Sequence, residues 1–520
     1  MTGGETWHDP HPSSAVLAFS TASELLGTLG SGELTSESLT DALIERIEAL
    51  DGRGPQLHSI ISLHEGALDE ARRLDAERRS SKLRGPLHGL PVLVKDNIDT
   101  AGALGTTAGS YALAASPPRV DATLVSGLRA AGAIILGKTN LSEWANFRGR
   151  VSSSGWSAVG GQCRNPHGLD RSPGGSSAGS GAAVAAGFAP FGIGTETDGS
   201  ILCPAAACGI VGLKPTVGLV SRAGIVPISP SQDTAGPMAR SVSDVALLLE
   251  VLAAAGTDRR DAATFKRPPA SPAFGGYIEA ARRSPAGLRV GIARGEGFSG
   301  YHLPTDEAAE VAYEALRAAG VELVDPVGCE RANDDDELLV LKTELKSALE
   351  HYLAERGGGS GSAPCSLAEV VAFNEANAAE RLDLFGQDLL VESAAAGALD
   401  DPGYLAAQER NWRRTRKDGI DAACERHGIK ALVAPTMPPS WLIDHVNGDA
   451  HSAAAWGQAA VAGYPSITVP VGLHHGLPVA VALWGPAWSE ATLLSLAAAI
   501  ERGIGPGPPP SWRGATGLLA

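Results

Sequence analysis

The sequence contains few aromatic and few sulfur-containing residues. Phe, Trp and Tyr make up 5% of its 520 residues, and there are 3 Met and 6 Cys. The cysteines are scattered at irregular intervals, unlike the dense pattern of a disulfide-stabilised domain. Cys203 and Cys208 could form one ligand pair, but no second pair and no His follow at the spacing of a zinc module. We therefore expect reduced thiols, no bound metal and no cofactor.

The chain also lacks an excess of positive charge. Its 42 Lys and Arg residues are outnumbered by 58 Asp and Glu residues, which gives a formal net charge of −16. Such a surface repels the phosphates of nucleic acids and anionic membranes. We expect neither as a partner.

Long hydrophobic runs are missing as well. The most apolar stretch, Gly181 to Gly194, is interrupted by Gly and Pro and is shorter than the roughly 20 residues that a membrane helix needs. The first ten residues lack the positive start and apolar core of a secretory signal. The sequence thus predicts a cytoplasmic protein with no membrane association.

What the sequence does contain is a repeated alternation of helix and strand patterns. At 35–50, for example, Leu39, Leu43, Ile47 and Leu50 form the apolar stripe of an amphipathic helix. Alternating patterns of this kind predict an α/β fold. The predicted helices are 35–50, 122–131 and 306–319, the last N-capped by Thr305, and the predicted strands are 90–96, 133–137, 288–293, 321–324, 431–435 and 466–470.

The same patterns suggest how the chain is divided. Gly, Pro and Ser are frequent at 255–285 and 356–364, which predicts exposed loops. The strands at 431–435 and 466–470 each end in proline and predict that the C-terminal part returns to the sheet. We interpret the chain as one compact domain with four segments: an N-terminal helical segment (1–70), a core (71–255), an elaboration near the substrate entrance (256–425) and a C-terminal return to the sheet (426–520).

The densest signal for chemistry is a Gly- and Ser-rich block between Arg171 and Pro215. Glycine lets backbone approach a ligand closely, although a solvated turn is the plain alternative. A phosphate-binding loop fails because no Gly-Lys-Ser/Thr follows the glycines. A nucleophile elbow at Gly175-Ser-Ser177-Ala-Gly179 fails because turn residues and prolines, not an apolar strand, precede it.

A third interpretation places a nucleophile at Ser200. The strand pattern from Phe191 runs into a tight turn at Asp198-Gly199, which would expose Ser200 beside free backbone N–H groups. The candidate base is Lys95, at the end of the strand pattern that begins at Leu90. Burial lowers the pKa of a lysine and makes its neutral amine accessible, whereas a lone lysine at a strand end is ordinarily a solvated surface residue.

At these residues the sequence resembles the amidase signature family. The matching motifs are Gly89-Leu-Pro-Val-Leu-Val-Lys95-Asp-Asn, Gly174-Gly-Ser-Ser, Gly194-Thr-Glu-Thr-Asp-Gly-Ser-Ile201 and Pro204-Ala-Ala-Ala-Cys-Gly-Ile-Val-Gly-Leu-Lys-Pro-Thr216. The resemblance implies a central mixed, twisted β-sheet covered by helices on both faces. It also implies a carboxamide hydrolase.

The resemblance further implies a role for each residue of a Ser-(cis)Ser-Lys triad. Ser200 would attack the amide carbon, and Ser176, after a cis peptide bond from Gly175, would relay the proton to Lys95. Ser176 and Ser200 are 24 residues apart, the family's usual separation. The oxyanion hole would consist of the backbone N–H groups of Thr197, Asp198, Gly199 and Ser200.

The closest motif similarity is to bacterial peptide amidases, which remove the C-terminal carboxamide of peptides. Leu202 and Asp198 depart from the wider family, which often has arginine and glycine there, but fit this narrower group. The substrate is thus expected to be a small amide or a short peptide amide, acted on by a monomer or homodimer. Candidate pocket residues are Trp144, Phe147, Trp156, Ser177, Gln232 and Asp233, although buried aromatics also serve plain packing.

Three alternatives remain open at this point. The chain could be a broad-specificity aryl or aliphatic amidase, or the glutamine-hydrolysing component of a tRNA-dependent amidotransferase, which its acidic character disfavours. It could also be a catalytically silent binding module of the same fold. Such a module would be expected to have lost Lys95, Ser176 or Ser200, and all three are present.

Overall fold

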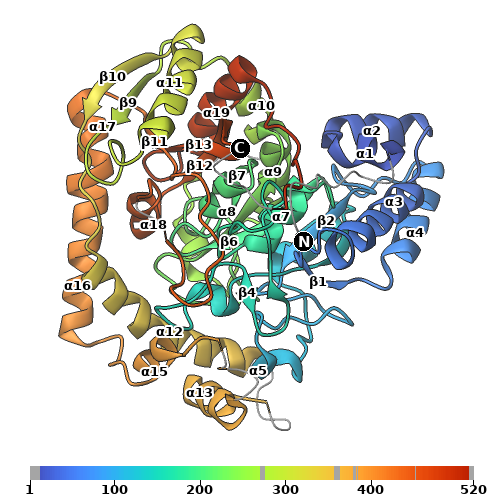
Figure 1. The fold of residues 1–520 in the computed structure, drawn as a ribbon, viewed down its shortest axis with the longest axis horizontal. Coiled ribbons are helices and arrows are strands. Elements are labelled where there is room, and N and C mark those ends of the chain that lie inside the picture. Colours follow the sequence, from blue (N-terminus) through green and yellow to red (C-terminus); the bar gives the residue numbers. More distant parts are fainter. Residues whose placement is uncertain are drawn as a thin grey trace.

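The computed structural model describes residues 12–269, 276–356, 363–378, 382, 384–450 and 453–514. Its centre is an eleven-stranded mixed sheet with the order β1-β3-β2-β6-β8-β7-β12-β13-β11-β9-β10 (Figure 1). In sheet order these strands are Ile60–Leu63, Ile134–Thr139, Pro91–Lys95, Phe191–Glu196, Thr234–Ala239, Val211–Lys214, Ser466–His474, Leu477–Trp484, Ala431–Pro435, Arg289–Ala293 and Glu322–Val327.

Strand direction changes across the sheet. β2 runs parallel to both β3 and β6, and β11, β9 and β10 are parallel to one another. The pairs from β6 through β8, β7, β12 and β13 to β11 are antiparallel. A separate two-stranded ribbon joins β4 (Trp156–Ser157) to β5 (Gly161–Gln162).

Helices pack on both faces of the sheet. On β13, Val481 and Leu483 belong to a hydrophobic core shared with α9 and α19, whereas Ala482 and Trp484 belong to a second core shared with α8 and α18. The alternation of side chains along a strand accounts for this division. The α-helices are α1 Pro12–Phe19, α2 Ala22–Ser31, α3 Ser36–Ile47, α4 Ala67–Arg79, α5 Tyr111–Ala114, α6 Thr123–Ala130, α7 Ala178–Ala185, α8 Leu202–Ala207, α9 Val242–Ala253, α10 Gly276–Arg282, α11 Leu303–Ala318, α12 Asp334–Arg356, α13 Leu367–Ala376, α15 Asp388–Ala394, α16 Pro402–Trp412, α17 Asp421–His427, α18 Gly457–Ala462 and α19 Glu490–Ile504.

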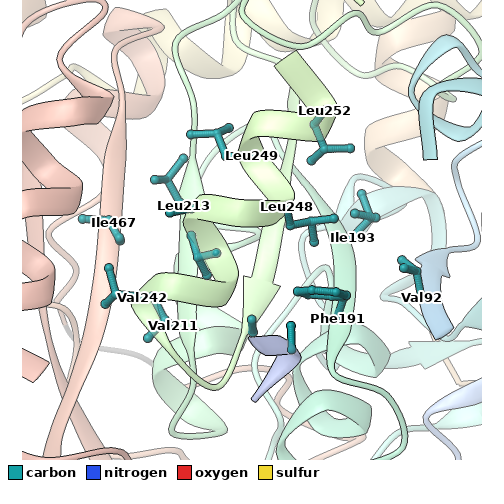
Figure 2. Close-up of a cluster of buried hydrophobic side chains, with 14 of the residues drawn as sticks. Val92, Phe191, Ile193, Val211, Leu213, Val242, Leu248, Leu249, Leu252 and Ile467 are labelled. Atoms are coloured by element: carbon teal, nitrogen blue, oxygen red, sulfur yellow. The ribbon is translucent and has the colours of Figure 1, made fainter. Parts of the chain in front are cut away.

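The core over the middle of the sheet is built around α9. Leu248, Leu249 and Leu252 of this helix are buried among Phe191 and Ile193 of β6 and the apolar side chains of β7 (Figure 2). This packing fixes β6, the strand that leads directly to Ser200. The predicted fold class, a mixed sheet covered by helices on both faces, is therefore confirmed.

The structure corrects several element boundaries. α11 begins at Leu303 after an N-cap at His302, because Pro304 suits the first turn of a helix, so the predicted N-cap at Thr305 is wrong. β12 continues to His474 beyond Pro470, with a change of register between Pro470 and Gly472. Pro470 is tolerated because β12 pairs with β7 only over 466–468.

The predicted loops are also only partly correct. The interval 255–285 contains a 3-10 helix at Ala262–Lys266 and the helix α10, whose Tyr277, Ala280 and Ala281 are buried. Of the loop expected at 356–364, residues 357–362 lie outside the described part of the chain. The four-segment division stays a prediction, although strands from all four segments join the same sheet.

Candidate active site

Lys95, at the end of β2, lies in the interior of the protein. Its side chain has 0% exposure, and its Nζ lies 2.7 Å from Ser176 Oγ and 2.9 Å from Thr195 Oγ1. Burial lowers the pKa of Lys95 well below its usual 10.5, although the carboxylates of Glu196 and Asp233 oppose the shift. With the amine neutral, the contact to Ser176 lets the serine hydroxyl donate to Nζ.

Ser176 lies on the loop before α7. The Gly175–Ser176 peptide bond is cis, which confirms the prediction, and the Ser176 carbonyl accepts a hydrogen bond from Ser142 N at 3.0 Å. A Cβ atom at position 175 would lie only 2.4 Å from Ser142 Oγ. Glycine at 175 is therefore required for the loop to approach Ser142.

Ser200 follows the turn at the end of β6. Gly199 has φ of 76°, and a Cβ there would lie 2.4 Å from Trp456 Nε1. The Ser200 carbonyl accepts a hydrogen bond from Ser177 N at 3.1 Å, so the backbone holds this turn beside the Ser176 loop. Ser200 is 7% exposed, and its hydroxyl is hydrogen-bonded to no residue among those the structure describes.

A buried carboxylate supports the Ser200 turn from behind. Glu196 Oε2 accepts hydrogen bonds from Ile201 N at 2.8 Å and Leu202 N at 3.0 Å. These are the residues that directly follow Ser200 and begin α8. Burial raises the pKa of Glu196, while the nearby Lys214 and the backbone donors oppose that rise.

Thr195 and Asn97 extend the hydrogen bonds around Lys95, and neither was recognised from the sequence as a site residue. Thr195 Oγ1 accepts from Lys95 Nζ and, at 3.0 Å, from Asn97 Nδ2. Ser177 is bonded to the same threonine: its Oγ donates to Thr195 O at 3.0 Å and accepts from Thr195 N at 3.1 Å. Asn97 and Thr195 each lie within one of the family motifs. Membership in these motifs was the only sequence signal that could have indicated a role for them in the site.

The predicted pocket residues Gln232 and Asp233 lie next to the Ser200 turn. The Thr197 hydroxyl donates to Asp233 Oδ1 at 2.6 Å, and Gln232 Nε2 donates to Thr197 O at 3.3 Å and to Glu337 Oε1 at 2.8 Å. Burial raises the pKa of Asp233 to about 6 and that of Glu337 to about 7. Burial, reinforced by repulsion from Glu337, also raises the pKa of Asp198.

The predicted aromatic pocket residues are not gathered into one wall. Trp144 and Phe147 are buried in a hydrophobic cluster with Leu345 and Leu349 of α12. Trp156 lies elsewhere, with the Arg148 guanidinium 5.2 Å from its ring centre and the Phe385 ring at 5.2 Å. The contacts of Trp144 and Phe147 are those of core residues, and their role in substrate binding stays a prediction.

A distant loop reaches the Ser176 region through Asp449. Its Oδ1 accepts hydrogen bonds from Ser154 N and Trp441 Nε1, both at 2.9 Å, and its Oδ2 accepts from Ser154 Oγ at 2.5 Å. The next residue, Gly155, donates to Ser142 Oγ at 2.9 Å. Ser142 in turn holds the Ser176 carbonyl. Asp449 thus fixes the outer end of a chain of contacts that leads to the Ser176 loop.

Replacing Asp449 with Ala should lower the free energy of unfolding by about 2 kcal/mol, because three hydrogen bonds to a carboxylate are lost. Urea unfolding measures this change, and any activity that depends on the Ser176 loop should fall several-fold as the loop loses its support. Asp444→Ala is the matched control, since among the described residues the Asp444 carboxylate accepts hydrogen bonds only from Val446 and Asn447 of its own loop. Equal effects of the two substitutions would contradict the role of Asp449.

Comparison with known proteins identifies the family of this chain. The family model described as Amidase matches residues 38–494. A solved structure of the peptide amidase PAM in complex with the competitive inhibitor chymostatin is 48% identical, with a TM-score of 0.90, and covers 95% of this chain and 99% of that chain. A probable amidase of Arabidopsis thaliana is 37% identical over 476 residues, 90% of this chain and 87% of the relative.

A glutamyl-tRNA(Gln) amidotransferase component from Symbiobacterium thermophilum is also similar, with 35% identity over 484 residues, 91% of this chain and 94% of the relative. The chain belongs to the amidase family. It is an enzyme that hydrolyses the C–N bond of amides.

No helix in the described part of the chain is both long and apolar enough to cross a membrane.

Proposed function

We propose that Ser200, Ser176 and Lys95 form the catalytic triad of this amidase. The observation that carries the proposal is the 2.7 Å contact between the buried Lys95 amine and the Ser176 hydroxyl. The neutral amine accepts the Ser176 proton, and Ser176 then accepts the proton of Ser200 as Ser200 attacks the carbonyl carbon. The same route runs in reverse to protonate the leaving nitrogen.

The oxyanion of the tetrahedral intermediate is stabilised by the N–H groups of Asp198 and Ser200 in the turn 197–200, whereas the Gly199 N–H interacts with the Glu196 carboxylate. The N–H groups of Asp198 and Ser200 donate to no atom of the residues described, which leaves them available for a ligand. Removal of one such donor costs about 10²- to 10³-fold in kcat in other hydrolases.

The substrate class is the C-terminal carboxamide of short peptides. Support comes from the similarity to peptide amidase PAM across 95% of this chain and from the low exposure of Ser200, which excludes large folded substrates from the nucleophile. We further propose that the protein acts in the cytoplasm, without nucleic acid partners, as a monomer or homodimer.

Ammonia release from three amides tests the substrate class. We expect kcat/KM for an N-acetylated dipeptide amide to exceed that for acetamide and that for free glutamine by at least roughly tenfold, since the peptide supplies extra binding contacts. A preference for acetamide would favour a broad aliphatic amidase. A preference for glutamine would favour an amidotransferase component, the activity named for one of the relatives.

A further inference from the structure

Asn97, which closely follows Lys95 in the sequence, has an amide group of which only one end is bonded within the protein. The residue is 2% exposed, and its Nδ2 donates to Thr195 Oγ1 at 3.0 Å. Its Oδ1 is buried and accepts no hydrogen bond from the described residues. A buried amide oxygen without a donor is destabilising and rare in native proteins. This oxygen is therefore suited to a donor that comes from outside the chain.

The position of the Asn97 amide is fixed by its neighbours. Val226 N donates to the Asn97 carbonyl at 2.8 Å, and Thr195 holds the side chain. Thr195 Oγ1 also lies 2.9 Å from Lys95 Nζ, which in turn lies 2.7 Å from Ser176 Oγ. Three consecutive hydrogen bonds thus connect Asn97 to the Ser176 hydroxyl, so its free oxygen is close to the proposed triad.

Asn97 also lines a cavity of about 290 Å³ between α12, the segment 222–233 and the end of β6. The inner surface of this cavity includes Thr195, Glu196 and Thr197, which lead into the Ser200 turn. The proposed peptide substrates need room for their acyl part next to that turn. The cavity adjoins the turn, and the Asn97 amide is part of its wall.

Two of the side chains that line the cavity contain a buried oxygen without a hydrogen-bond partner among the described residues, and they are Asn97 and Glu196. The other oxygen of Glu196 accepts from Ile201 N at 2.8 Å and from Leu202 N at 3.0 Å. This carboxylate is therefore directed toward the start of α8. The Asn97 oxygen is the neutral acceptor of the pair.

A neutral acceptor suits a neutral N–H donor, and a peptide amide has such a donor close to the reacting bond. The α-nitrogen of its last residue is two bonds from the carbonyl carbon that Ser200 attacks. Because this nitrogen is acylated, it is uncharged and donates one hydrogen bond without accepting any. Acetamide has no such group, and the α-nitrogen of free glutamine is a charged ammonium far from the side-chain amide.

We propose that Asn97 Oδ1 accepts a hydrogen bond from the α N–H of the last residue of the substrate, and that this contact determines the preference for peptide amides. The inference rests on the proposed function of the triad and names one residue that sets its specificity. Asn97 takes no part in the proton transfers. A site built to bond an N–H discriminates against an analogue that lacks it, because the buried acceptor is then left unpaired.

The test compares an N-acetylated dipeptide amide with the analogue in which a CH2 group replaces the α N–H of the last residue. Both compounds keep the terminal carboxamide, and ammonia release measures both reactions. For the wild-type enzyme, kcat/KM should be roughly tenfold higher for the peptide amide, the scale of one buried hydrogen bond. In Asn97→Leu, which has a similar volume and no acceptor, the two values should lie within about twofold of each other. A loss shared by both substrates reports the broken bond to Thr195 and cancels in this ratio.

Val226→Ala is the matched control, because Val226 contributes an apolar side chain to the same cavity and keeps its backbone bond to Asn97. This variant should retain the wild-type ratio between the two substrates. Equal kcat/KM of the wild-type enzyme for both substrates would mean that the Asn97 oxygen bonds only water, and would overturn the inference while leaving the proposed function intact. This comparison needs no variant, so it decides the matter even if Asn97→Leu fails to fold. The wild-type ratio retained in folded Asn97→Leu would also overturn the inference, whereas no ammonia from either substrate would contradict the proposed function itself.

Discussion

Replacing Ser200 with Ala is expected to lower kcat for peptide amide hydrolysis by about 10⁵-fold, the scale on which serine hydrolases lose activity without their nucleophile. Ser200 is 7% exposed and follows a turn held by Gly199 and Glu196, so removal of its hydroxyl leaves the turn's supports in place. Ammonia release under single-turnover conditions measures the effect.

The control for this substitution is Ser347→Ala, an exposed serine on α12, which should retain wild-type kcat. The thermal unfolding midpoint of Ser200→Ala should stay within a few degrees of wild type. A Ser200→Ala protein that turns over peptide amide at more than about a hundredth of the wild-type rate would show that another group attacks the amide. Such a result would also mean that the Ser200 turn has no catalytic role.

Replacing Lys95 with Met is expected to lower kcat/KM by about 10²- to 10⁴-fold, the usual contribution of a general base. Methionine fills a similar volume in this fully buried position but accepts no proton from Ser176. Lys95→Arg should be equally inactive, because a guanidinium stays charged at any pH the protein tolerates. The arginine variant keeps a positive charge but cannot act as a base. Its inactivity would therefore show that the base, and not the charge, is required.

The pH dependence of the wild-type enzyme gives a second readout of Lys95. Burial lowers the pKa of Lys95 well below 10.5, and only the neutral amine accepts a proton. As the pH rises through this lowered pKa, the neutral fraction grows, so kcat/KM should rise on the acidic side and level off above it. The residual activity of Lys95→Met should lack this rise. Wild-type activity in Lys95→Arg, or the same rise in Lys95→Met, would exclude Lys95 as the base.

Structural features that depend on residues close together in the sequence could be predicted from it. The apolar stripe that includes Leu39 and Ile47 predicts a helix at 35–50, and the structure has α3 there, with a capping box at Thr35 that was not predicted. The need for glycine at 175 and 199 could likewise be inferred from the sequence, because both positions lie within family motifs. In both cases a Cβ would clash with a neighbouring side chain.

Contacts between distant segments could not be predicted in this way. Asp449 reaches Ser154 across 295 positions, and nothing near either residue specifies the partner. α10 lies in a stretch rich in Gly and Pro, and its burial against neighbouring helices overrides that local signal. The aromatic pocket candidates illustrate the same limit, because residue type does not distinguish a core position such as Trp144 from a wall of a pocket.

A cavity of about 290 Å³ that Asn97 and Thr195 help to line depends on the same kind of distant contact. Its lining residues come from the end of β6, the segment 222–233 and α12, which lie far apart in sequence. α12 is anchored there by Tyr352, whose hydroxyl donates to Asp99 at 2.7 Å. Helix periodicity alone predicts neither this anchor nor the space next to it.

Covalent labelling with a fluorophosphonate, followed by peptide mapping, tests the role of Ser200 as nucleophile most directly. We expect that loss of amidase activity parallels attachment of one label per chain, that the label is on Ser200, and that Lys95→Met is labelled far more slowly than wild type. Complete inactivation with the label on a different residue, or full activity with Ser200 labelled, would contradict that role.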